Sequence, residues 1–369
     1  MSIIRNNHLP PKPILFYNIM PKKIAVVAAG WLGDNIMLGS LLRKLQQQGH
    51  HTTILNTHAH FVGLFTRIEG IDAILDFPLP KKSLCLRKRW QCATHLKAYH
   101  FDEIIYAPNT FKSALIGFFA GIPLRSGWHG EARYILLNKR HINKSHCPTM
   151  VQTYVQLAYK PSDKIIAFAE CPEPRMKSQS LSLSQLASSH GIKLQDRHAS
   201  AIMLCPGAAA GESKRWPIKH YIALSNLLLD AGYAVHILGG PGEIALGNQI
   251  QMGTHNRCTN WTGKTNLTGV VDVMQHAQAV VANDSGLMHM AAALSKPVMA
   301  IYGATPAYFA PPLTTRGKTF SVNLPCKPCG KNNCPLNTLD CLHGIKVMEI
   351  FQAIRALRLP TTEKPIKST

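Results

Sequence analysis

The sequence has few acidic residues and no long apolar run. Only 19 of its 369 residues are Asp or Glu, against 40 Lys and Arg, which gives a formal net charge of +21. A membrane-spanning helix needs about 20 consecutive apolar residues, and no stretch approaches that length. The short apolar segment 14–19 is flanked by prolines and lacks a small-residue cleavage site, so a secretory signal is not expected. We therefore expect a cytoplasmic protein with anionic partners.

Charged residues are scarce overall, at 16%, whereas hydrophobic residues make up 46%. This balance excludes a disordered chain, and the length suits two domains that each bury a core. No zinc finger, RNP motif or arginine-rich arm accompanies the positive charge, so nucleic-acid binding is not favoured. Anionic lipid headgroups and acidic glycolipids remain as partners, and a generally basic surface is the alternative.

Cysteine is plentiful, with ten residues. Six are scattered, several of them in apolar contexts, which suits a reducing compartment. The other four form a CxxC-x4-C-x6-C segment, whose cysteines are Cys326, Cys329, Cys334 and Cys341. Its first pair has metal-ligand spacing, but the remainder matches no standard ribbon or finger. A structural zinc site and a loop of reduced cysteines are both open interpretations, and the second is favoured.

Two series of strands alternate with helices. The first series begins with the apolar run 23–29, which is typical of a parallel strand covered on both faces. This strand ends at the turn 30–34. The other elements expected in this series are a helix up to Gly49, strands at 52–55 and 103–106, and a helix at 111–120. The second series has expected strands at 201–205, 233–238, 279–282 and 298–301, and expected helices at 218–230 and 286–294.

A segment rich in Ser, Gln and Lys, residues 172–198, separates the two series and is the expected linker. Two such series predict an α/β protein with two Rossmann-like domains that face a central cleft. We place these domains at 22–175 and 199–355, with flexible ends at 1–21 and 356–369. Ligands of such sheets bind beyond the carboxyl ends of the strands, where the glycine-rich turns of this sequence fall.

The glycine-rich turns match no familiar nucleotide fingerprint. Gly30-x-x-Gly33 lacks the three glycines of dinucleotide sites, and the run 207–214 does not fit the Walker A spacing. Asp34 follows the first turn and is either a general base that points into the cleft or a helix N-cap. Lys214, before a helix whose first turn contains Pro217, suits a pyrophosphate, although an exposed lysine there is equally compatible.

The stretch Asn283-Asp284-Ser285-Gly286-Leu287-Met288-His289 joins an expected strand to a small-residue helix. Backbone N–H groups at Ser285 and Gly286 would form an anion site at the helix N-terminus. Asp284 could instead cap the helix, and His289 taken alone is more often a core residue. Basic and aromatic residues of the first series could bind phosphates and carboxylates of an acidic acceptor. These are Lys112, Arg125, Trp128 and Arg133.

In combination, Gly33-Asp34, Lys214-Arg215-Trp216-Pro217 and residues 283–289 resemble the ADP-heptose:lipopolysaccharide heptosyltransferases of glycosyltransferase family 9. The stretches 109–115 and 120–128 resemble the heptosyltransferase II branch, and the similarity extends from about Lys22 to the final helix. The resemblance implies a GT-B fold and inverting transfer of L-glycero-D-manno-heptose from ADP-heptose to heptosyl-Kdo2-lipid A, with no required cofactor or metal. A related enzyme with another sugar donor or acceptor is the alternative.

The resemblance also assigns roles to residues. Asp34 is the implied general base, and the acceptor is implied to lie in the N-terminal domain. The implied sugar-donor residues are Lys214, Glu243, Asp284, Ser285, Gly286 and His289. Because the implied acceptor is anchored in lipid, peripheral contact with the cytoplasmic face of the inner membrane is expected.

Overall fold

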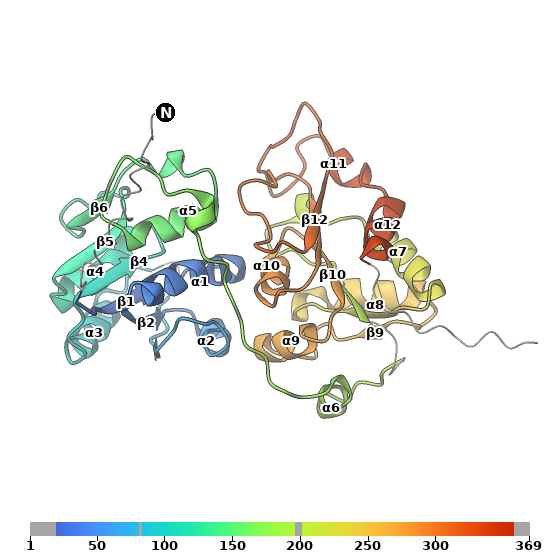
Figure 1. Cartoon of the computed structure of the whole chain (residues 1–369), viewed down its shortest axis with the longest axis horizontal. Helices are drawn as coiled ribbons and strands as arrows, with labels where there is room; N and C mark the ends of the chain where they lie inside the picture. Colours follow the sequence, from blue (N-terminus) through green and yellow to red (C-terminus); the bar gives the residue numbers. More distant parts are fainter. Residues whose placement is uncertain (1–19, 81–82, 196–200, 358–369) are drawn as a thin grey trace, which may run out of the picture.

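The computed structural model describes residues 20–80, 83–195 and 201–357, which form two α/β halves (Figure 1). Each half is built on a parallel sheet of six described strands. The strand order is β3-β2-β1-β4-β5-β6 in the first sheet and β12-β11-β10-β7-β8-β9 in the second. The expected pair of Rossmann-like sheets is thereby confirmed. The ends expected to be flexible lie almost wholly outside the described residues.

Apolar sequence accounts for the central strands. Helices cover both faces of each sheet, so strands β1 and β10 are buried along nearly their whole length. The strands of the first sheet are β1 (Lys23–Val27), β2 (His51–Asn56), β3 (Ala73–Asp76), β4 (Glu103–Tyr106), β5 (Leu124–Trp128) and β6 (Lys139–His141). Those of the second sheet are β7 (Ala201–Cys205), β8 (Ala234–Ile237), β9 (Thr259–Asn260), β10 (Ala279–Asn283), β11 (Val298–Tyr302) and β12 (Gly317–Ser321).

Helices divide each half into an inner and an outer layer (Figure 1). The inner helices, which face the other half, are α1 (Leu32–Gln47), α2 (Val62–Phe65), α5 (Met150–Val155), α9 (Leu267–Met274) and α10 (Gly286–Ala293). The outer helices are α3 (Leu86–Lys97), α4 (Phe111–Ala120), α7 (Ile218–Asp230), α8 (Ile244–Gly253), α11 (Asp340–His343) and α12 (Val347–Ala356). No helix of the described residues is long and apolar enough to cross a membrane.

Contacts between the inner helices hold the halves together. Helix α1 packs on α10, and α2 packs on α9. Arg67 pairs with Asp272 across this interface at 2.7 Å, and both side chains are largely buried. Asp272 also accepts a hydrogen bond from the main-chain N–H of Gln179, in the segment that connects the halves. That segment contains helix α6 (Leu183–Ser189), although the sequence predicts only a linker there.

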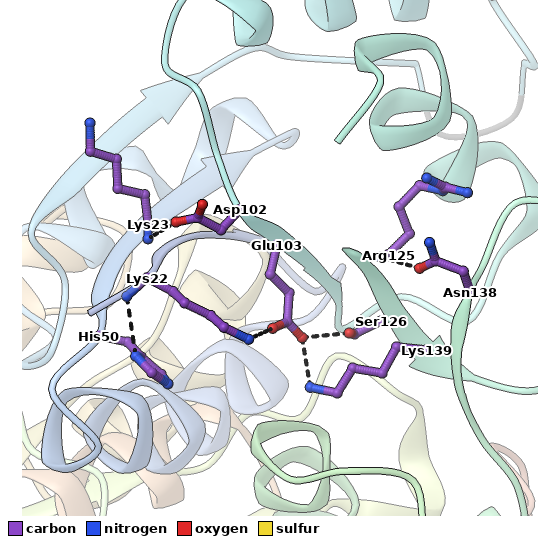
Figure 2. Close-up of polar contacts among 9 residues, drawn as sticks. All are labelled: Lys22, Lys23, His50, Asp102, Glu103, Arg125, Ser126, Asn138 and Lys139. Carbon is purple, nitrogen blue, oxygen red and sulfur yellow. Dashed lines mark hydrogen bonds and ion pairs between the residues drawn. The ribbon is translucent and has the colours of Figure 1, made fainter. Parts of the chain in front are cut away.

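A polar cluster closes the amino-terminal edge of the first sheet (Figure 2). The buried Glu103 carboxylate contacts Lys139 at 2.7 Å, Lys22 at 3.4 Å and the Ser126 hydroxyl at 2.5 Å. Burial acts to raise the pKa of Glu103, but the two lysines and the hydrogen bonds outweigh it and lower the pKa overall. Glu103 starts β4, so this cluster lies opposite the sheet edge where ligands bind.

Candidate active site

A cavity of about 960 Å³ lies between the carboxyl ends of the two sheets. Residues 31–34 of the first half line it together with the second half's loops after β7, β8 and β10. Its size is that of a pocket for a small molecule or cofactor. The expectation that the glycine-rich turns gather at one cleft is therefore confirmed.

Asp34 is the third residue of α1, not its N-cap, since Trp31 occupies the cap position without a side-chain cap hydrogen bond. The wholly buried Asn35 fixes the preceding turn by bonding both the N–H and the carbonyl of Ala29, at 2.8 and 3.1 Å. The Tyr154 hydroxyl donates a hydrogen bond to the Asp34 carboxylate. Burial raises the pKa of Asp34, while Tyr154, Lys144 and Lys214 act to lower it.

A second cavity, of about 350 Å³, lies within the first half. Asp34, Trp31 and Met150 line this cavity as well as the interdomain one. Lys112 and Lys144 also line it and provide positive charge. The Asp34 carboxylate therefore lies where two cavities meet, one confined to the first half and one shared by both halves.

Three of the expected acceptor residues are held by main-chain carbonyls. Trp128 lines the smaller cavity, and its indole N–H donates to the Thr153 carbonyl at 2.8 Å. Arg133 is buried and donates to the carbonyls of Gly130, Pro108 and Trp128 and to the Asn109 side chain. Arg125 lies near the amino-terminal edge of the sheet (Figure 2). Neither arginine lines the two cavities described above.

Lys214 belongs to the 3-10 helix Glu212–Lys214 and reaches into the cleft from the second half. Its Nζ lies 2.6 Å from Oδ2 of Asp284, which also accepts a 2.5 Å hydrogen bond from the Thr305 hydroxyl. This pair is partly screened from solvent, with 20% of the lysine and 9% of the aspartate side chain exposed. Asp284 precedes the N-cap of α10, so the capping alternative does not hold for it.

The N-terminus of α10 opens onto the cleft. Its N-cap, Ser285, has a buried hydroxyl that no described residue hydrogen-bonds. An oxygen so placed, beside free backbone N–H groups and a positive helix end, fits a site for an anionic ligand. Glu243 lines the same cleft and accepts a 2.6 Å hydrogen bond from the N–H of Gly240.

The first turns of α1 and α10 approach each other closely. A Cβ atom on Gly33 would lie 2.9 Å from the His289 ring, and one on Gly286 would lie 2.6 Å from the Leu32 side chain. His289 is buried, and this burial lowers its pKa to about 4. The Asp284 carboxylate acts to raise that pKa, and the Lys214 ammonium acts to lower it. The ring is therefore neutral at neutral pH, and it packs against Gly33 where the two helices meet.

Asn283 connects loops of the second half through hydrogen bonds. Its wholly buried side chain accepts hydrogen bonds from the Trp216 N–H and the Tyr221 hydroxyl and donates to the Pro206 carbonyl at 2.7 Å. The four-cysteine segment supports the same region, since Asn332 and Lys331 carbonyls accept hydrogen bonds from Ser213, next to Lys214. Sequence reasoning included Asn283 in a motif without giving it a role, and it missed Thr305 and Tyr154, because these roles depend on tertiary contacts.

The four cysteines line one small cavity of about 20 Å³. Even so, the described residues contain no group of three or more His, Cys, Asp or Glu side chains placed to hold a metal ion. The zinc interpretation is therefore not supported. None of the four forms a disulfide in the structure, and the loop of reduced cysteines stays a prediction.

Comparison with known proteins adds to this geometry. Residues 89–339 match the model of glycosyltransferase family 9 (heptosyltransferase). Lipopolysaccharide heptosyltransferase 2 of Escherichia coli is 36% identical over 345 residues, which cover 91% of this chain and 99% of that protein. Lipooligosaccharide heptosyltransferase 2 of Haemophilus ducreyi is 37% identical over 79% of this chain and 86% of its own length. The solved structure of E. coli ADP-heptose lps heptosyltransferase II superposes with a TM-score of 0.78, at 30% identity, over 91% of this chain and 98% of that one. The expected GT-B fold is confirmed by this likeness.

Proposed function

Because the chain belongs to glycosyltransferase family 9, we propose that it transfers L-glycero-D-manno-heptose from ADP-heptose to the heptosyl-Kdo2-lipid A inner core of lipopolysaccharide. The observation that carries this proposal is the position of Asp34 between two cavities. A transferase needs one site for each substrate and a base where the two substrates meet. Residues 22–175 would hold the acceptor, and residues 199–355 would hold the sugar donor.

The reaction we propose is an in-line displacement. An acceptor hydroxyl oxygen attacks the anomeric carbon of heptose, and Asp34 takes the hydroxyl proton. The bond from that carbon to the phosphate oxygen breaks on the opposite face, and ADP leaves with the electron pair. Attack from the face opposite the leaving group inverts the anomeric configuration.

Positive charge for the leaving diphosphate would come from the second half. Lys214 supplies a cation, and Ser285 with Gly286 supplies N–H groups at the α10 N-terminus. Asp284 and Thr305 would orient the Lys214 ammonium, and Glu243, which lines the same cleft, would accept hydrogen bonds from the ribose hydroxyls. Since these groups neutralise the diphosphate, we propose that no cofactor or metal is required.

The acceptor would occupy the 350 Å³ cavity. Lys112 and Lys144 line it and suit the acidic groups of an inner-core glycolipid. Arg133, Trp128 and Arg125 would act by holding the cavity wall and the strands behind it. An acceptor anchored in lipid also implies peripheral contact with the cytoplasmic face of the inner membrane.

The test is an assay of the purified chain with ADP-heptose, a UDP-sugar or a GDP-sugar, each with the lipid acceptor and EDTA. Of the three donors, we expect only ADP-heptose to give ADP release and an acceptor that is heavier by one heptose. Transfer from another nucleotide sugar would instead identify a related glycosyltransferase. Loss of transfer in EDTA would contradict the metal-free part of the proposal.

Tyr154→Phe is expected to move the acidic limb of the pH profile to higher pH. The Tyr154 hydrogen bond lowers the Asp34 pKa, so its loss raises that pKa further and leaves less ionised base at a given pH. Activity should fall most at low pH and recover as pH rises through the new pKa. The measurement is kcat/KM from about pH 5 to 9.

Tyr159→Phe is the matched control, because Tyr159 follows α5 and its ring contact with Lys44 survives the change. A uniform loss of activity at every pH in Tyr154→Phe would show that Tyr154 acts through packing alone.

A further inference from the structure

Helices α3 and α4 carry apolar side chains that point outward. Leu86 is 51% exposed, Trp90 54% and Phe118 40%. Trp90 packs edge-on against Phe119, with ring centroids 5.5 Å apart, so the two helices form one continuous apolar surface. Large exposed aromatic groups that gather in one place indicate a contact surface rather than chance exposure.

Basic side chains surround these apolar groups. Arg87 and Lys88 are exposed beside Trp90 on α3. The Lys97 ammonium lies 5.9 Å from the Trp90 ring centre, and the Arg125 guanidinium lies 5.7 Å from that of Phe118. We call this surface the basic-aromatic face; its members are Leu86, Arg87, Lys88, Trp90, Lys97 and Phe118.

Acidic residues are missing from the same stretch of sequence. Residues 77–101 contain no Asp or Glu, and neither do residues 104–130. These two runs include the whole of α3 and α4. The two helices therefore contribute basic side chains to the face and no acidic ones.

The face adjoins the acceptor cavity. Arg89 of α3 and Lys112 and Ile116 of α4 line that cavity from the same two helices. Both helices lie on the outer side of the first half, away from the second half (Figure 1). A flat partner could cover the face without blocking the cleft between the halves.

We propose that the basic-aromatic face docks the protein on the surface of an anionic lipid bilayer. Tryptophan and leucine favour the headgroup boundary, and Lys and Arg beside them are attracted by anionic headgroups. Bound in this way, α3 and α4 deliver a lipid-anchored acceptor from the bilayer to the cavity that they line. This delivery role rests on the proposed function, whereas bilayer binding itself does not.

The test is co-sedimentation of the full chain with vesicles of phosphatidylcholine, with and without phosphatidylglycerol. We expect binding only to the anionic vesicles, and loss of that binding at high salt. The double variant Lys88→Glu/Trp90→Ser should bind them about tenfold or more weakly. Its transfer to the same acceptor without acyl chains should stay at the wild-type rate, which also shows that the variant is folded.

Lys346→Glu/Met348→Ser is the control with the same charge change, since both residues are exposed at the start of α12 in the second half. It should bind vesicles as the wild type does. Equal binding to neutral and anionic vesicles, or unchanged binding of the face variant, would overturn the proposal. Retention on DNA in place of vesicles, lost in the face variant, would overturn it too. Vesicle binding without heptose transfer would instead count against the proposed function alone.

Discussion

Asp34→Asn is expected to lower the turnover of heptose transfer by about 10²–10⁴-fold. Asn keeps the size of the carboxylate and can still accept the Tyr154 hydrogen bond, but it cannot take the acceptor's proton. Affinity for ADP should stay near the wild-type value, because the residues proposed to bind the diphosphate lie on the second half of the cleft. The measurements are single-turnover transfer rates and calorimetric titration with ADP.

Asp230→Asn serves as the control for loss of a carboxylate, since Asp230 is 66% exposed and pairs only at the surface with Arg257. It should transfer heptose normally. A near-normal rate in Asp34→Asn would show that another group is the base. A loss of ADP affinity equal to the loss of rate would place Asp34 in the nucleotide site.

Lys214→Ala is expected to lower kcat/KM by about 10²–10³-fold. The Nζ of Lys214 is the cation beside Asp284 in the cleft. Negative charge develops on the phosphate oxygen as its bond to the sugar breaks, and this cation would stabilise that charge. Unlike Asp34→Asn, this variant should also bind ADP weakly. ADP that binds only the folded chain raises the unfolding temperature by an amount that grows with the logarithm of its concentration over Kd, so at an ADP concentration near the wild-type Kd the shift should be largely lost.

Lys219→Ala removes an exposed lysine of the neighbouring helix α7 and should keep both the rate and the ADP-induced shift. The unfolding temperature without ADP separates binding from folding. If ADP stabilises Lys214→Ala as much as the wild type, the nucleotide diphosphate does not contact Lys214.

The central strands and longer helices could be predicted from sequence because their apolar residues follow the strand and helix periods. Strands β4 and β7 and helices α4 and α7 have the expected bounds. Strands such as β6 and β9 were not expected, since each has three residues or fewer and little apolar pattern. Pairing with a longer neighbour, not local sequence, holds such strands in place.

The side of the sheet that carries the site could also be predicted, because parallel strands send their carboxyl ends to one edge. Which side chains meet there could not. Tyr154 reaches Asp34 from α5, and Thr305 reaches Asp284 from the loop after β11, and no motif marks either contact. The sequence predicts that Arg133 binds acidic groups of the acceptor. In the folded chain it is buried and donates to main-chain carbonyls, and a sequence shows neither property. The roles of the cleft residues stay predictions.

The paired glycines at the first turns of α1 and α10 have a consequence for the width of the reaction gap. Each leaves room for one bulky neighbour, His289 at Gly33 and Leu32 at Gly286, so the close approach of α1 to α10 depends on both glycines. A methyl group at either glycine would clash with that neighbour, so the side chain or the helix that carries it would have to shift. Since a displacement of 1 Å can cost a reaction about 10²-fold, we expect a side chain at either glycine to slow the proposed transfer, because Asp34 and the donor residues lie on opposite sides of this contact.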